Sequence, residues 1–311
     1  MKKIVLIGGG VLGSQIAYQS AYKGFDVTIW LRSEASIERA RPKLERLHRI
    51  YVAELTAAKT SKGPYSPGLL DNGRTYTEAE LDERIAAADR ALKEIRLVTD
   101  LSEALKDADL VIEALAENLE QKIEFYQKAA PLLEEKTILA TNSSTLLPSA
   151  MAEYTGRPEK FLALHFANDI WRGNTAEVMG HAGTDQAMYD EVVAFAEAIS
   201  MVPLKLKKEK DGYILNSMLV PFLMAAQSLW ADDVADVEMI DKTWEMATGA
   251  PNGPFRILDV VGLTTAYNIL TNLPQAADPT TIYGRMAKRL KEEYIDQGKL
   301  GISTGEGFYK Y

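Results

Sequence analysis

The sequence predicts an α/β fold: a mainly parallel sheet flanked by helices, interrupted by a helical hairpin and followed by an all-helical domain. Three observations lead to this prediction. A glycine-rich turn at 8–13 joins a short apolar strand to a helix. Near-continuous apolar segments then alternate with helical segments as far as residue 206, and beyond it the pattern is mostly helical. Alternating strands and helices are typical of a parallel sheet that is covered on both faces.

The turn at 8–13 fits the spacing G-x-G-x-x-G of dinucleotide-binding sites. Gly8 allows the tight turn, Gly10 lets a pyrophosphate approach the backbone, and Gly13 lets the helix pack closely on the strand. The helix that opens at Val11 and Leu12 offers free N–H groups and the positive end of its dipole to phosphates. The turn therefore predicts a Rossmann-type dinucleotide-binding domain. The alternative is a glycine-rich turn that serves packing alone.

The end of the second strand, residues 25–31, bears on which dinucleotide binds. A site specific for NAD usually places an acidic residue there, which binds the adenosine ribose. Here the strand runs into Arg32 and Ser33, and Glu34 comes too late. Because a guanidinium and a hydroxyl suit a 2′-phosphate, we expect NADP rather than NAD as the coenzyme. In the alternative, Arg32 is a solvated loop residue and either coenzyme binds.

A helical hairpin is predicted as an insertion over residues 33–96. Apolar residues at helical spacing predict a first helix within 37–59. A loop containing glycine and proline follows at 63–73. Thr77 and Glu80 then have the spacing of a capping box, which begins a second helix.

One face of the first insertion helix is basic. Arg39, Lys43 and Arg46 recur at helical spacing and so lie on that face. The face could hold the phosphorylated tail of a nucleotide. A charge run on a helix is more often only a solvated face, and this alternative stays open.

Two polar loops follow strands of the sheet at its carboxyl edge. Glu117 and Asn118 come after the strand at 109–115, and Asn142 begins the loop after the strand at 137–141. Open α/β sheets bind their ligands at this edge. We therefore expect Glu117 and Asn142 to lie near the coenzyme.

The chain has three histidines, and His165 is the candidate for catalysis. It ends an apolar strand at 161–166, on the side where ligands are expected, whereas His48 and His181 lie on the insertion and in a glycine-containing turn. Glu177 could return beside His165 across a hairpin-like connection. A carboxylate there would orient the ring and stabilise its protonated form, which suits a general acid or base. Taken alone, such a histidine is more often structural.

Composition limits the protein classes that fit. The chain has 311 residues, enough for one large or two medium domains. Its net charge of −9 argues against partners such as nucleic acid or an anionic membrane. It has no run of about 18 apolar residues, and we expect neither a membrane span nor a signal peptide. The absence of cysteine excludes disulfides and thiolate metal sites and favours a cytoplasmic protein; we find no metal-ligand cluster.

The sequence divides into two predicted domains. We place an NAD(P)-binding Rossmann domain at 1–206 and a helical C-terminal domain at 207–311. Broad apolar faces on the helices of the second domain suggest dimerisation, so we expect a homodimer.

Further motifs identify the chain with a known family. They read DLVIEA at 109–114, ENL at 117–119, TNSS at 141–144, HF at 165–166 with Asn168, GY at 212–213 with Asn216, GPF at 253–255 and TGEGFYKY at 304–311. In order and spacing the chain resembles the L-3-hydroxyacyl-CoA dehydrogenase family, which includes 3-hydroxybutyryl-CoA dehydrogenases, over nearly its whole length. That family combines a Rossmann-type domain, a helical insertion and a helical dimerisation domain.

The resemblance implies roles for four catalytic residues. His165 would be the catalytic base and Glu177 the carboxylate that orients it. Ser144 and Asn216 would hold the substrate oxygen and carbonyl. In this interpretation His165 takes the proton from a C3 hydroxyl as hydride leaves C3 for C4 of the nicotinamide.

The resemblance also implies that Glu117, Lys122 and Asn168 line the nicotinamide half of the coenzyme. The chain departs from the family nearby. The family usually continues the histidine motif as Phe-Phe-Asn-Pro, whereas Ala167 and Asp169 stand here at the second and fourth positions. The insertion lacks the lysine-rich character that grips CoA, and the acid after the second strand is missing. The oxidoreductase chemistry is therefore better supported than the acyl-CoA substrate or a preference for NAD.

The sequence predicts an NAD(P)-dependent dehydrogenase of fatty acid metabolism that acts on a short-chain L-3-hydroxyacyl-CoA such as 3-hydroxybutyryl-CoA. One alternative is a ketoreductase or sugar-acid dehydrogenase of the same fold that uses His165 and Glu177 on a substrate without CoA. Another is a non-catalytic NAD(P)-binding protein. The intact set of four catalytic candidates argues against the last alternative.

Overall fold

The chain divides into two units. The computed structural model describes residues 1–60, 66–71 and 73–311. The first unit is Met1–Ile214 and the second is Leu215–Tyr311. The sequence-based division into a Rossmann domain at 1–206 and a helical domain at 207–311 stays a prediction.

The first unit is built on a mainly parallel sheet of eight strands in the order β3-β2-β1-β4-β5-β6-β7-β8. All neighbouring strands run parallel except β6 and β7, which are antiparallel. The strands are β1 (Lys3–Ile7), β2 (Asp26–Trp30), β3 (Arg96–Val98), β4 (Leu110–Glu113), β5 (Ile138–Thr141), β6 (Phe161–Phe166), β7 (Thr175–Met179) and β8 (Val202–Lys205). The predicted α/β class and the Rossmann-type domain are confirmed.

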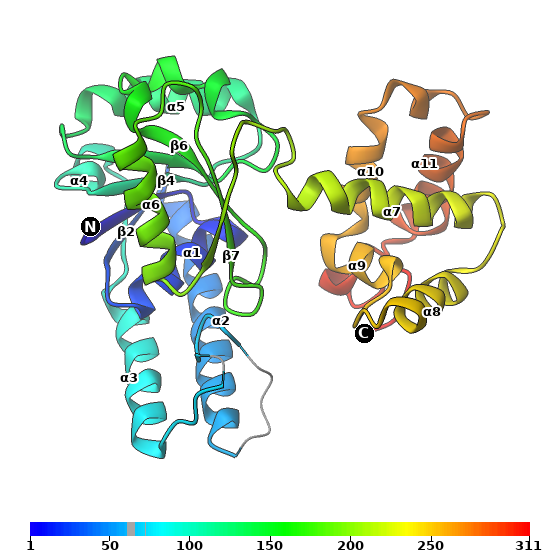
Figure 1. The fold of residues 1–311 in the computed structure, drawn as a ribbon, viewed down its shortest axis with the longest axis horizontal. Helices are drawn as coiled ribbons and strands as arrows, with labels where there is room; N and C mark the ends of the chain where they lie inside the picture. The colour runs from blue at the N-terminus through cyan, green and yellow to red at the C-terminus, as the bar shows by residue number, and fades with distance from the viewer. Residues whose placement is uncertain (61–65, 72) are drawn as a thin grey trace. The chain divides into compact units, whose positions relative to one another are not determined.

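Helices cover this sheet on both faces and make up most of the second unit (Figure 1). The helices of the first unit are α1 (Val11–Tyr22), α2 (Glu34–Ala58), α3 (Glu78–Glu94), α4 (Leu101–Leu105), α5 (Leu119–Ala129) and α6 (Gln186–Ala198). Those of the second unit are α7 (Leu215–Ala231), α8 (Val237–Thr248), α9 (Pro254–Val261), α10 (Leu263–Thr271) and α11 (Ile282–Glu293). In the part of the chain that the structure describes, no helix has the length and apolar character needed to cross a membrane.

Alternate residues of the strands supply two cores, one on each face of the sheet. In β1, Ile4 and Leu6 belong to the core beneath α1, α2, α3 and α6, whereas Val5 and Ile7 belong to the core beneath α4 and α5. All four side chains are fully buried. This two-sided burial explains why the strands read as continuous apolar runs in the sequence.

The insertion is the predicted helical hairpin, because α2 and α3 stand between β2 and β3 in the chain and lie side by side in Figure 1. The capping box at the start of α3 is formed: Thr77 Oγ1 accepts from the backbone of Glu80, and the Glu80 carboxylate accepts from the Thr77 backbone at 2.8 Å. Of the loop expected at 63–73, residues 63–65 and 72 lie outside the described residues. Residues 66–71 include a turn.

The C-terminal motif TGEGFYKY is a structural element of the second unit. The Asp259 carboxylate accepts from the backbone N–H groups of Phe308 and Tyr309 at 2.8 and 2.9 Å, and from the Tyr311 hydroxyl at 2.9 Å. A Cβ at Gly307 would come within 2.0 Å of that carboxylate, so the position requires glycine. The motif thus attaches the C-terminal segment to α9, which carries Asp259.

Candidate active site

His165 and Glu177 lie directly opposite each other on the antiparallel strands β6 and β7. His165 Nδ1 and a Glu177 oxygen are 2.9 Å apart, and the two side chains are only 5% and 4% exposed. Opposite residues of an antiparallel pair project from the same face of the sheet, which is why a spacing of twelve residues brings them together. The carboxylate fixes the ring so that Nδ1 carries a proton and Nε2 is left to exchange one.

The second oxygen of Glu177 and one face of the His165 ring are also held. The backbone N–H of Ile214 donates to Glu177 Oε1 at 2.8 Å. The ring of Tyr213 stacks on His165 with 4.6 Å between the ring centroids and 27° between the planes. Tyr213 is 1% exposed, and its backbone has a positive φ of 53°. The only signal for Tyr213 in the sequence is its place after Gly212 in a family motif.

Burial raises the pKa of Tyr213 well above its ordinary range, and the carboxylates of Glu117 and Glu177 raise it further. Tyr213 therefore stays a neutral phenol beside the imidazole. It supplies an aromatic surface rather than a charge, and it restricts the ring of His165 to one plane.

Glu117 organises the loop that carries Ser144. One carboxylate oxygen of Glu117 accepts from the backbone N–H groups of Ser144 and Thr145 at 3.0 and 2.8 Å and from the Ser143 hydroxyl. Burial opposes ionisation of Glu117, but the hydrogen bonds from Ser143 and Thr145 and the Lys122 ammonium together lower its pKa below the ordinary value. Glu117 thus positions Ser144, which is itself half-buried.

Lys122 is buried in the interior next to Glu117 and does not line an exposed surface. Its ammonium donates to both oxygens of Glu113 at 2.6 and 2.9 Å, and it lies 3.7 Å from Glu117. The side chains of Lys122 and Glu113 are 1% and 0% exposed. Tyr126 and Thr141 donate to the same Glu113 carboxylate at 3.0 and 2.8 Å. In this geometry Lys122 acts on the site through Glu117.

Asn142 and Asn168 occupy different environments. Asn142 is 8% exposed, and its Oδ1 accepts from the backbone N–H of Phe166 at 3.1 Å, next to His165. It therefore ties the end of β5 to the end of β6. Asn168 lies just beyond β6 and is exposed.

The glycine turn has the geometry of a phosphate cradle. Gly8 has a φ of +107°, and a Cβ there would lie 2.9 Å from the backbone oxygen of Ala114. A Cβ on Gly13 would lie 2.3 Å from the backbone oxygen of Gly8, whereas one on Gly10 would meet nothing within 4 Å. Two glycines therefore close the turn and the third leaves open space at the start of α1. This geometry fits the pyrophosphate of a dinucleotide.

The first residues of α1 leave that space accessible. Val11 is 63% exposed, and Leu12 is half-buried. Lys43 of the insertion helix donates to the backbone oxygen of Gly9 at 2.8 Å. The basic face expected on α2 is thus partly used inside the protein, and Lys43 supports the turn, a role that its spacing in the sequence did not reveal.

A second polar group lies after β2, where the adenosine ribose of a dinucleotide is expected. Ser33 Oγ lies 3.1 Å from Ser36 Oγ, and an Arg39 nitrogen donates to Ser36 Oγ at 2.7 Å. Arg32 is exposed next to them. Hydroxyls and guanidiniums therefore gather at the amino end of α2, which is also the positive end of its dipole.

Family models match almost all of the chain. The model described as 3-hydroxyacyl-CoA dehydrogenase, NAD binding domain, matches residues 3–210, and the model of the C-terminal domain matches residues 212–311. The chain belongs to the 3-hydroxyacyl-CoA dehydrogenase family. It is accordingly an oxidoreductase of the CH–OH group with a site for a nicotinamide coenzyme.

Individual relatives agree with this membership. The human mitochondrial hydroxyacyl-coenzyme A dehydrogenase is 30% identical and aligns with 100% of this chain and 91% of its own. The 3-hydroxybutyryl-CoA dehydrogenase of Clostridioides difficile is 30% identical over 99% of both chains. Among solved structures, a diketoreductase with dual catalysis of dicarbonyl compounds is 49% identical, has a TM-score of 0.84 and covers 100% of this chain and 99% of its own.

Asn216 belongs to α7 in the second unit, where it is half-buried. Its expected contact with the substrate stays a prediction. Of the other three catalytic candidates, His165 lies near the end of β6, Glu177 lies opposite it in the middle of β7, and Ser144 lies in the loop after β5.

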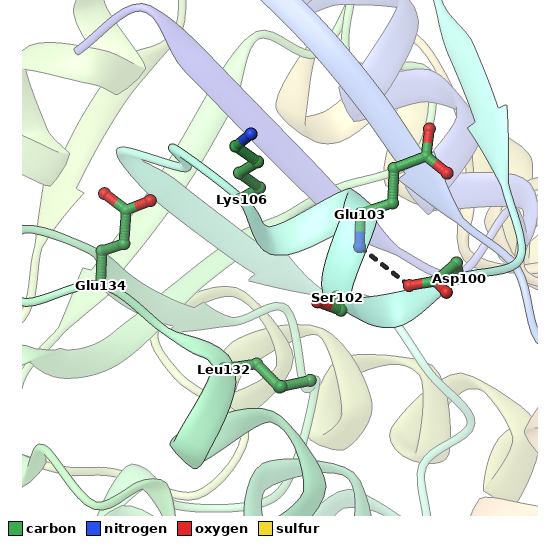
Figure 2. Close-up of a pocket in the computed structure, with 6 residues that line it drawn as sticks. All are labelled: Asp100, Ser102, Glu103, Lys106, Leu132 and Glu134. Carbon is green, nitrogen blue, oxygen red and sulfur yellow. Dashed lines mark hydrogen bonds between the residues drawn. The ribbon is translucent and has the colours of Figure 1, made fainter.

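The first unit also has a surface pocket of about 460 Å³, drawn in Figure 2, which is separate from this site. The residues that line it are Asp100, Ser102, Glu103, Lys106, Leu132 and Glu134. None of them is a predicted catalytic or coenzyme residue. With three carboxylates and one ammonium, the pocket does not suit a dinucleotide phosphate.

Proposed function

We propose that the protein transfers hydride between a nicotinamide coenzyme and the C3 carbon of a 3-hydroxy or 3-oxo compound, with His165 as general acid and base. The observation that carries this proposal is the buried pair of His165 and Glu177 at the carboxyl edge of the sheet, 2.9 Å apart. When bound, the coenzyme supplies hydride to the 3-oxo carbon or accepts it from the 3-hydroxy carbon.

His165 moves the proton that balances the hydride. In oxidation, Nε2 takes the proton of the C3 hydroxyl, and the hydrogen on C3 leaves as hydride with the electron pair of the C3–H bond. The C3–O bond thereby becomes a carbonyl. In reduction, the imidazolium returns the proton to the oxygen of the forming alkoxide. Glu177 accepts from Nδ1–H throughout and stabilises the positive ring.

Ser144 and Asn216 are proposed to hold the substrate. The Ser144 hydroxyl would donate to the C3 oxygen, and its place is set by Glu117. Asn216 would bind the second carbonyl, two carbons away. Such fixed donors orient the reacting carbon toward the hydride donor.

The residues that are proposed to hold the coenzyme form three groups. The glycine turn with Val11 and Leu12 would hold the pyrophosphate. Asn142, Asn168 and Glu117, with Lys122 beneath it, would surround the nicotinamide half. Arg32 and Ser33 would bind the adenosine end.

We propose NADP as the preferred coenzyme. The hydroxyls of Ser33 and Ser36 and the guanidiniums of Arg32 and Arg39 supply donors for a 2′-phosphate. Stopped-flow or fluorescence titration with NADPH and NADH separately measures this preference. Equal affinity for both coenzymes would remove it.

The substrate class is the finer part of the proposal. A short-chain 3-hydroxyacyl-CoA, such as 3-hydroxybutyryl-CoA, is favoured by the family and by relatives of that name. A 1,3-dicarbonyl compound without CoA is the second candidate, because the 49% identical structure is that of a diketoreductase. The contact of Lys43 with the backbone of Gly9, which leaves one basic group fewer for a CoA tail, also favours this second candidate.

One experiment separates the two substrate classes. Oxidation of NADPH and of NADH is measured with acetoacetyl-CoA and, separately, with ethyl acetoacetate. Both probes carry the same 3-oxo unit, so a difference in kcat/KM reports the contribution of CoA. If neither probe is reduced by a protein that binds coenzyme, the proposed reaction is wrong.

We further propose a homodimer formed by the second unit and a cytoplasmic location. The second unit exposes several large apolar side chains, among them Met218, Met239, Trp244 and Met246. Light scattering measures the oligomeric state, and a monomer at micromolar concentration would contradict the dimer. The cysteine-free composition supports a reducing compartment. Fractionation of the source cells tests the location, since some relatives are named as mitochondrial.

A further inference from the structure

The loop between β6 and β7, residues 167–174, follows directly from His165 and carries Asn168. Its conformation is defined by its own backbone. Asp169 has a φ of 56°, and its carbonyl accepts from the N–H groups of Arg172 and Gly173 at 2.8 and 3.0 Å. A non-glycine residue holds a positive φ only where the surroundings fix it.

Glu54 of the insertion helix α2 supplies the main side-chain contact to this loop. Its Oε1 accepts from Trp171 Nε1 at 3.1 Å and from Arg172 Nε and Nη2 at 2.9 and 2.6 Å. Its Oε2 accepts from the Ser66 hydroxyl. Both oxygens of this carboxylate are thus occupied.

Burial makes this contact specific. The Glu54 side chain is 7% exposed, and Trp171 is 3% exposed with its ring 5.8 Å from that of Tyr51. A buried carboxylate is costly unless it is paired and hydrogen-bonded. Arg172 provides that charge from the loop, so the buried state of Glu54 and the observed path of the loop depend on each other.

Helix α1, which begins at the glycine turn, also contacts this loop. Oε1 of Gln15 in α1 accepts from the N–H groups of Asp169 and Ile170 at 2.9 and 3.4 Å. Because α2 also contacts the glycine turn through Lys43, this one helix touches both the coenzyme turn and the loop after His165.

We propose that Glu54 is a positioning residue: through Trp171 and Arg172 it holds the 167–174 loop, and with it Asn168, in the geometry that hydride transfer needs. The role in turnover rests on the proposed function above. Displacement of a reacting group by about 1 Å costs up to about 100-fold in rate. Loss of Glu54 therefore lowers kcat by about tenfold or more. The KM for coenzyme changes by a smaller factor, because the glycine turn keeps its own contacts even when Asn168 is displaced.

The test compares four variants. Glu54→Ala removes the contact. Glu54→Gln retains an oxygen for Trp171 and Arg172 and an amide for Ser66, so it is expected to keep kcat within about threefold of the parent. Glu45→Ala changes an exposed carboxylate on the same helix and is expected to be silent. Leu81→Ala destabilises the same hairpin at a 2% exposed position on α3 without touching the loop.

A fall in kcat in Glu54→Ala, with recovery in Glu54→Gln, supports the proposal, provided that Leu81→Ala keeps its kcat at a similar loss of melting temperature. The proposal is overturned if Glu54→Ala stays within twofold of the parent, or if Leu81→Ala loses as much activity. If the parent reduces no 3-oxo probe, the proposed function fails, and amide hydrogen exchange at 169–173 decides this inference by itself. Exchange at least tenfold faster in Glu54→Ala than in Glu45→Ala supports the loop contact, and equal exchange overturns it.

Discussion

Two buried acid–base pairs lie at the carboxyl edge of the sheet, and they differ in how completely each is enclosed. Glu113 at the end of β4 pairs with Lys122, and its oxygens also accept from Tyr126, Thr141 and the backbone N–H of Leu115. Nδ1 of His165 in β6 pairs with a carboxylate, but Nε2 has no hydrogen-bond partner among residues 1–60, 66–71 and 73–311.

This difference indicates different roles for the two pairs. The Glu113 carboxylate is buried and both of its oxygens accept hydrogen bonds from the protein, so it is not available to a substrate. Its partner Lys122 lies 3.7 Å from Glu117 and supports that carboxylate electrostatically. A pair with one ring nitrogen left over can exchange a proton. Burial and charge alone therefore do not distinguish the pair that we propose as catalytic from the other pair. The ring nitrogen without a partner among the described residues does.

We call Glu113 and Lys122 the closed pair, and His165 and Glu177 the open pair. The largest expected effect comes from removing one partner of the closed pair. Lys122→Met leaves the Glu113 carboxylate buried without its cation, and loss of one partner of a buried pair costs about 3 to 5 kcal/mol. Urea unfolding measures the loss. Lys128→Met, which breaks a surface pair on the same helix at 65% exposure, is expected to cost at most about 0.5 kcal/mol. Equal costs would show that the pair is not closed.

A smaller effect, on rate rather than stability, is expected at the open pair. Glu177→Gln keeps the shape of the side chain but removes the charge that stabilises the His165 ring. We expect kcat to fall by at least about 10- to 100-fold, the loss that follows when the partner of a metal-bound histidine is removed. Steady-state kinetics over a pH range measures it. An unchanged kcat and pH profile would remove Glu177 from the mechanism.

The coenzyme end is expected to respond less. Arg32→Ala weakens NADPH by about tenfold, the loss of one charge-assisted hydrogen bond, and leaves NADH within about twofold. Arg41→Ala, at an exposed position on α2, is the control and should change neither affinity. Equal weakening of both coenzymes would contradict the preference for NADP.

The smallest effect concerns the pH dependence of stability at Glu117. Its pKa in the folded protein lies below its ordinary value of 4.5, so the folded state binds this proton less readily than the unfolded state. The stabilisation is present above pH 4.5 and is lost as the pH falls through the lower folded value. Glu117→Gln should therefore flatten the acid side of a melting-temperature profile. Glu120→Gln, exposed on α5, is the control.

The sequence predicted the parts of the site that depend on local pattern. The glycine turn follows from spacing, and the meeting of His165 and Glu177 follows from two short strands close in the chain. The helical hairpin was evident because apolar periodicity and the Thr77 capping box mark it independently.

The rest depends on contacts between distant segments. Nothing in the local sequence shows that Lys122 is buried. Its burial depends on the Glu113 carboxylate, which also accepts hydrogen bonds from Tyr126 of α5 and Thr141 of β5. The contact between Glu54 and Arg172 spans 118 residues, and no periodicity encodes it. Tyr213 stacks on His165 although 48 residues separate them, and it has a positive φ. Neither feature can be predicted from a local residue pattern.

The most direct test of the account is turnover by His165→Gln beside the parent protein. The amide of glutamine can hydrogen-bond but cannot act as a base near neutral pH. We expect reduction of the 3-oxo probe to fall by about 1000-fold, within the usual range for loss of a general acid or base, while fluorescence titration shows unchanged coenzyme binding. Turnover within tenfold of the parent would contradict the central claim that the open pair at this edge is the acid–base catalyst.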